Sequence, residues 1–90
     1  DLKLFERLAR AVNESREVGF DYRKPGVAAT EPRQVQPYHL ANRENSWYLV
    51  GHDLDRGALR TFALARMTGL VVAERRFERP ADFSPERFFG

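Results

Sequence analysis

The sequence predicts a mainly β domain with an N-terminal α-helix, in which about five short antiparallel strands form a small, strongly bent sheet or barrel. Three observations predict this class. Apolar residues recur at three- and four-residue steps over the first 16 residues, as on one face of a helix. After that they alternate with polar residues, as in half-buried strands, and turn-forming residues separate these segments roughly every 8–12 residues. We therefore expect the helix to cover one end or face of the sheet.

The helix is expected at residues 2–16. Its apolar stripe consists of Leu4, Phe5, Leu8, Ala11 and Val12, and charged residues occupy the opposite side. Asp1 is a suitable N-cap, because its carboxylate can accept a hydrogen bond from a free backbone N–H group of the first turn. Residues of β type follow, so the helix should end near Ser15 and Arg16.

Two strands are expected next. Residues 18–22 place Val18, Phe20 and Tyr22 on one face and polar residues or glycine on the other. A loop opened by Lys24, Pro25 and Gly26 runs to about Pro32. Residues 33–40 form the second strand. Pro37 within it indicates an edge position or a bulge, because proline cannot donate a ladder hydrogen bond.

The following two strands form a hairpin. Residues 46–53 have the highest β-propensity in the chain. Residues 54–57 form the hairpin loop, with Gly57 suited to a positive φ, and residues 58–64 form the fourth strand. A fifth strand is expected at 70–77.

The composition is that of an ordinary soluble globular chain. The 90 residues are 42% hydrophobic and 31% charged, with a net charge of +2 that does not by itself argue for nucleic acid. The absence of cysteine excludes disulfides and thiolate metal sites and fits the cytoplasm. No apolar run approaches the roughly 18–20 residues of a membrane span, so no membrane partner is expected. The chain begins at Asp1 without methionine, which suggests an excised fragment.

Arginine supplies 13 of the 15 basic residues. A GC-rich genome would favour arginine codons, whereas a functional reading would use the planar guanidinium to bind phosphate or carboxylate. Arg60 and Arg66 flank Phe62 and Leu64 on the face of the fourth strand that should point inward. Each arginine then lies at one rim of the sheet.

Two interpretations of these arginines stay open. In the structural one, each pairs with an acid such as Asp21, Asp53 or Glu74 and packs its stem on the core. In the functional one, Arg60 or Arg66 converges with Tyr38, His39 or Tyr48 on an anion such as phosphate. A bulge after Leu64 would turn Arg66 to the other face. Trp47 is expected in the core, and Tyr48 is the better candidate for exposure.

Catalytic constellations are missing. His39 and His52 lie on different predicted strands without an obvious third metal ligand, and a site formed with Asp53 has little support. Asp53 and Asp55 lie in a turn, where aspartates usually accept hydrogen bonds from their own backbone. Ser46 and Ser84 lack a convincing base. We expect no enzyme, no metal and no cofactor.

The segment WYLVGHDLDRGALRTFALARM resembles the defining stretch of WYL domains, with Trp47, Tyr48 and Leu49 as the tripeptide. VGFDYRKPG is similar to the family's first strand, and RQVQPYHLANRENSWYLVGHD to its second and third, with Pro37 in the usual proline position. LRTFALARM resembles the family's Arg-x-Phe-x-x-x-Arg signature. Ala63 and Ala65 stand where the family often has a polar or charged residue.

The resemblance implies an Sm-like or SH3-like five-stranded barrel at residues 1–79, with residues 80–90 beginning the linker to a C-terminal extension. It implies a ligand-sensing domain of a bacterial transcription regulator, attached to a helix-turn-helix domain. The expected effector is single-stranded DNA or RNA or a nucleotide-like molecule. The positions that match the family's binding surface are Tyr38, His39, Tyr48, Arg60 and Arg66. A protein-interaction or dimerisation module without its own ligand is the alternative, with Val71 and Val72 or Phe88 and Phe89 as its apolar surface.

Overall fold

The computed structural model describes residues 1–89, except for the side chain of Phe89. Helix α1 (Leu2–Glu14) precedes five strands, β1 (Arg16–Tyr22), β2 (Glu31–Arg43), β3 (Ser46–Asp53), β4 (Ala58–Ala63) and β5 (Met67–Arg76). A 3₁₀ turn, η1 (Leu64–Arg66), joins β4 to β5, and a short helix, α2 (Pro85–Phe89), ends the described chain. Among the described residues, no helix combines the length and the hydrophobicity that a membrane span requires.

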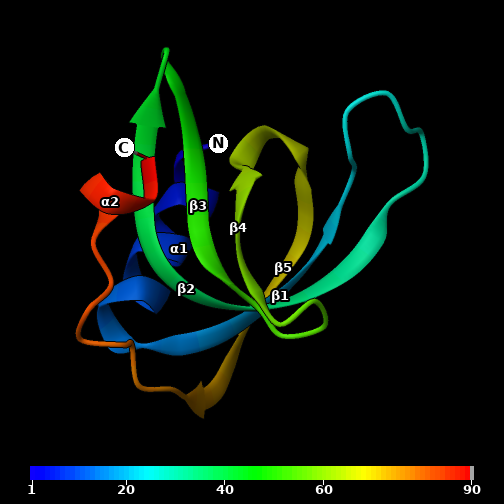
Figure 1. Cartoon of the computed structure of the whole chain (residues 1–90). Coiled ribbons are helices and arrows are strands. Elements are labelled where there is room, and N and C mark those ends of the chain that lie inside the picture. Colours follow the sequence, from blue (N-terminus) through cyan, green and yellow to red (C-terminus); the bar gives the residue numbers. More distant parts are fainter. Residues whose placement is uncertain (90) are drawn as a thin grey trace.

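The strands form one antiparallel sheet in the order β4-β3-β2-β1-β5, which curls strongly with α1 packed at its concave side (Figure 1). The predicted fold class is therefore confirmed. Among the described residues no ladder joins β4 to β5, so closure into a barrel stays a prediction. A side chain of β1 contacts β4 across the curl of the sheet, because the Tyr22 hydroxyl accepts a hydrogen bond from the Ala63 N–H at 3.0 Å.

Helix α1 forms as its apolar stripe predicts. Leu8 and Ala11 are fully buried against the sheet, and Leu4, Phe5 and Val12 pack on the same core. The Asp1 carboxylate accepts a hydrogen bond from the Lys3 N–H at 3.0 Å, which confirms the cap. The helix ends at Glu14 rather than Arg16, because Ser15 adopts a left-handed conformation with φ 53° and its N–H closes the last turn.

Pro37 lies at a bulge in an interior strand. Strand β2 pairs with both β1 and β3, which excludes the edge position. The register shifts between the pairs Pro37–Gly51 and His39–Val50, so Tyr38 is the extra residue. Gly51 makes this close approach feasible, since a Cβ there would lie 2.6 Å from the Gln36 carbonyl oxygen. The bulge alternative is confirmed.

The fourth strand ends earlier than predicted. It stops at Ala63, η1 turns the chain, and β5 begins at Met67 instead of Leu70. Contacts with the end of β1 accompany this turn, because Arg66 O accepts a hydrogen bond from the Arg23 N–H at 3.1 Å. The expectation of one continuous face running to Arg66 is therefore wrong.

Trp47 is also placed differently from the prediction. Its side chain is 41% exposed, although its ring packs on Phe5 with centroids 4.7 Å apart. Within the Trp-Tyr-Leu tripeptide, Leu49 is the residue that is fully buried. Tyr48 is half-buried rather than exposed. Trp47 therefore covers the edge of the core instead of filling it.

The chain after β5 folds back along β2 (Figure 1). Phe77 and Phe83 pack on the Tyr38 ring with centroid separations of 5.8 and 5.2 Å. The Arg79 guanidinium donates a hydrogen bond to the Tyr38 carbonyl at 2.6 Å. These contacts attach the tail to the bulge, and the predicted domain boundary at residue 79 stays a prediction.

Candidate functional site

Tyr48 and Arg66 line one hollow of about 650 Å³, formed where the start of α1 meets β3 and η1. The partly exposed Trp47 and Phe5 also line it, so three aromatic side chains and one guanidinium face the same space. The Arg66 guanidinium donates a hydrogen bond to the Arg23 carbonyl at 3.4 Å, and no ion pair with an acid is found for it within residues 1–89. Asp1 is the one acidic residue among those lining this hollow. The arrangement can stack a planar group and bind an anion.

Arg60 lies apart from this hollow. It pairs in register with Gly51, which places it on the core face of β4, two residues before the buried Phe62. Its side chain is half-buried and has no hydrogen bond or ion pair within the described part of the chain. None of the predicted acidic partners Asp21, Asp53 and Glu74 pairs with it there, and Asp53 lies against Arg33 instead. The structure thus separates the two arginines that the sequence placed on one strand face.

The Tyr38 side chain is buried and is not exposed to a ligand. It is 5% exposed beneath the aromatic residues of the tail, and burial raises the pKa of its hydroxyl above the ordinary value. Together with His52 it lines a second hollow, of about 500 Å³, which Phe83 and Phe88 also line. His39 is half-buried on β2 and lines neither hollow. The five predicted site residues therefore do not converge at one place.

A buried charge pair was missed by the sequence analysis. Arg33 is 4% exposed and Asp53 is 0% exposed, and Arg33 Nε lies 4.0 Å from Asp53 Oδ2. The Asp53 Oδ1 atom accepts hydrogen bonds from the N–H groups of Asp55 and Arg56, which confirms its predicted role in the turn. The alternation of Arg33 with Val35 was a signal that Arg33 faces inward, since Val35 is fully buried.

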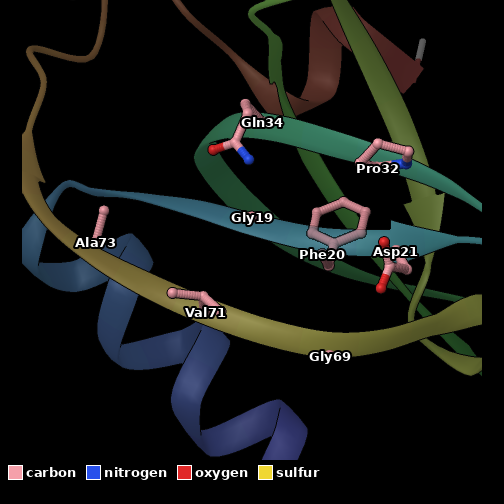
Figure 2. A pocket seen from close by; sticks show the side chains of 8 residues that line it. All are labelled: Gly19, Phe20, Asp21, Pro32, Gln34, Gly69, Val71 and Ala73. Carbon is pink, nitrogen blue, oxygen red and sulfur yellow. The ribbon is translucent and has the colours of Figure 1, made fainter.

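A further hollow of about 300 Å³ lies on the outer face of β1, between β2 and β5 (Figure 2). Gly19 at its centre lies beneath the Gln34 side chain, whose Nε2 atom would be 2.9 Å from a Cβ at this position, and Val71 beside it is 64% exposed. Asp21 is the only charged residue among those lining this hollow, so it does not suit an anion. Val72, by contrast, packs on the core, and the side chain of Phe89 lies outside the described structure. Residues 1–89 hold no cluster of three or more side chains suited to a metal ion.

Known proteins are similar to this chain in sequence and in fold. The family model of the WYL domain matches residues 3–72. Protein PafB of Mycobacterium leprae is 40% identical over 65 residues, which cover 72% of this chain and 20% of that protein. Protein PafB of Mycobacterium tuberculosis H37Rv is 37% identical over 65 residues, with the same coverage. The solved structure of proteasome accessory factor B/C (PafBC) of Arthrobacter aurescens matches with a TM-score of 0.89 and 34% identity, over 97% of this chain and 14% of that one. The chain thus spans about a fifth of the length of these curated relatives.

Proposed function

The chain belongs to the WYL domain family, and from this premise we propose that it is the ligand-sensing domain of a bacterial transcription regulator. It binds a nucleotide-like molecule or single-stranded nucleic acid through arginine and aromatic side chains. Binding is relayed to an attached helix-turn-helix domain, in a longer cytoplasmic protein whose C-terminal extension begins near residue 80. The domain performs no catalysis in this proposal.

The observation that carries the proposal is the hollow shared by Trp47, Tyr48 and Arg66. Aromatic faces stack on bases of any sequence, and a guanidinium binds phosphate through its planar set of donors. The Arg66 charge has no acidic partner among the described residues, so it is available to an anion. Arg60 supplies a second cation from β4, outside this hollow. Tyr38 and His39 are secondary contacts, and Tyr38 requires the tail to move.

A fluorescence-anisotropy titration with a short single-stranded oligothymidine tests this function. Each phosphate contact contributes about 0.7 to the slope of log K against log salt, so Arg60→Ala/Arg66→Ala should lower the slope by about 1.4. The matched control is Arg10→Ala/Arg75→Ala, which removes the same charge from exposed positions away from this hollow. Folding of each variant is checked by circular dichroism. Equal losses in the two double variants would mean that binding follows net charge, and would refute the proposed site.

Dimerisation or contact with a neighbouring domain is a second candidate function. The exposed Val71 favours it, because burying an apolar side chain of this kind against a partner is favourable (Figure 2). Sedimentation of the wild type and Val71→Ser without ligand tests it. A ligand-free dimer that Val71→Ser dissociates would support this function, whereas a monomeric wild type would oppose it.

A further inference from the structure

Three cationic side chains converge on one carboxylate oxygen at the start of β2. Glu31 Oε1 lies 3.1 Å from Arg33 Nη2, 3.6 Å from Lys24 Nζ and 3.9 Å from Arg56 Nη2. Lys24 comes from the loop after β1, Arg33 from β2 and Arg56 from the turn between β3 and β4. We call Lys24, Arg33 and Arg56 the cationic cradle. Its residues are distant in sequence and meet only in the folded chain.

The base of the cradle is rigid, and its rim is open. The Arg33 side chain is 5% exposed and lies against the fully buried Asp53, so it cannot turn towards solvent. Its Nε atom has no hydrogen-bond acceptor within residues 1–89, although it is buried. Lys24, Arg56 and Glu31 are all partly exposed, with Glu31 the most exposed of the three. A ligand can therefore reach Arg33 when the Glu31 side chain rotates away.

The charges of the cradle fit a doubly charged anion. With Glu31 rotated out, three positive charges and the negative charge of Asp53 leave a balance of +2. A phosphate monoester carries about −1.5 to −2 at neutral pH and offers three acceptor oxygens, whereas a backbone phosphodiester carries a single charge. The Glu31 carboxylate neutralises only one of these charges, and all three cations share one of its oxygens. A terminal phosphate therefore matches the cradle better than the residue that now occupies it.

We propose that the cationic cradle of Lys24, Arg33 and Arg56 binds a phosphate monoester, and that Glu31 is an internal counter-ion which the phosphate displaces. The monoester belongs to a free nucleotide or to the 5′-phosphorylated end of a single strand. This site lies outside the hollow of Tyr48 and Arg66, and it binds phosphate whether or not that hollow binds nucleic acid.

The first experiment titrates the ¹⁵N-labelled 90-residue chain with adenosine 5′-monophosphate, with adenosine as the control and ionic strength held constant. Amide shifts should saturate at Lys24, Glu31, Arg33 and Arg56, and adenosine should leave them unchanged. Glu31→Gln removes the competing charge and should tighten binding roughly tenfold, and Arg56→Ala should weaken it roughly tenfold, since each tenfold change corresponds to about one charge-assisted contact.

Matched variants separate this site from effects of net charge. Glu78→Gln makes the same charge change as Glu31→Gln at an exposed position, and Arg10→Ala matches Arg56→Ala. Both controls should bind within about twofold of the wild type. The proposal is overturned if Glu31→Gln binds like Glu78→Gln, if Arg56→Ala binds like Arg10→Ala, or if the shifts occur away from the cradle. Arg33 is left intact, because its burial gives it a structural role.

A second experiment identifies the source of the phosphate. It also tests the cradle separately from the proposed function. A 5′-phosphorylated oligothymidine that binds roughly tenfold more tightly than its 5′-hydroxyl form, with the gain lost in Arg56→Ala, would assign the cradle to strand ends. Equal binding of the two oligomers, together with binding of the mononucleotide, would assign it to free nucleotides. In the proposed function, the 5′-hydroxyl oligomer binds through Arg60, Arg66 and the aromatic residues beside Arg66, and not through the cradle. Failure of this oligomer to bind would therefore refute the proposed function without refuting the cradle.

Discussion

Replacing Asp53 with asparagine keeps the shape of the side chain but removes the charge that faces Arg33. The Oδ1 atom can still accept hydrogen bonds from the N–H groups of Asp55 and Arg56, so the turn is preserved. The atom 4.0 Å from Arg33 Nε changes from an acceptor to a donor, and two donors then face each other in a fully buried place. The substitution therefore isolates the energy of the buried charge pair.

Removing one member of a buried pair costs roughly 3–5 kcal/mol, because the other charge is left without compensation. Arg33 keeps its hydrogen bond to the half-exposed Glu31 at 3.1 Å, so we expect the lower end, about 3 kcal/mol. A domain of this length has a total free energy of unfolding of roughly 5–13 kcal/mol. The melting temperature should therefore fall by about 12 °C or more.

Urea unfolding followed by far-UV circular dichroism measures this change. Asp55→Asn is the control, since Asp55 is exposed in the same turn and should cost less than about 0.5 kcal/mol. Adding Arg33→Met completes a double-mutant cycle, in which we expect a coupling of about 2 kcal/mol between Arg33 and Asp53. A loss below about 1 kcal/mol for Asp53→Asn, or a coupling near zero, would refute the assignment of this pair as an energetic unit.

Three further substitutions test the fold around the site. Gly51→Ala would place its Cβ 2.5 Å from Val35 Cγ1, so overpacking should cost about 3 kcal/mol or more in urea unfolding; a cost below about 1 kcal/mol would contradict this close approach. Tyr22→Phe leaves the Ala63 N–H without its acceptor and should cost about 1–2 kcal/mol, with faster amide exchange at Ala63 as the specific readout. Burial raises the pKa of Tyr38, so the unfolded chain loses this proton first, and stability should fall as the pH rises above about 10 and on through the folded pKa. Tyr38→Phe should reduce this alkaline loss, and an unchanged pH profile would contradict the burial of its hydroxyl.

The amino-acid sequence was sufficient to predict the helix, the alternation of the strands and the family. The apolar stripe of α1 and the inward residues of β1 depend on local periods of 3.6 and 2 residues, which are visible without the fold. It also limited Pro37 to an edge or a bulge and assigned Asp53 to backbone hydrogen bonds in its turn, since both rules concern neighbouring residues. The sequence named candidate site residues, but it could not show which of them lie together, because their relative positions depend on distant parts of the chain.

Which of those residues lie close together is visible only in the folded structure. Arg60 and Arg66 were separated when β4 ended at Ala63, where contacts from Tyr22 and Arg23, about 40 residues earlier, accompany the turn. Tyr38 was buried by aromatic residues of the tail that lie about as far along the chain in the other direction. Arg33 lies next to Asp53 because the register of β2 against β3 pairs Asp53 with Val35, two residues after Arg33. Each of these outcomes joins groups far apart in sequence, and a local pattern carries no information about such contacts.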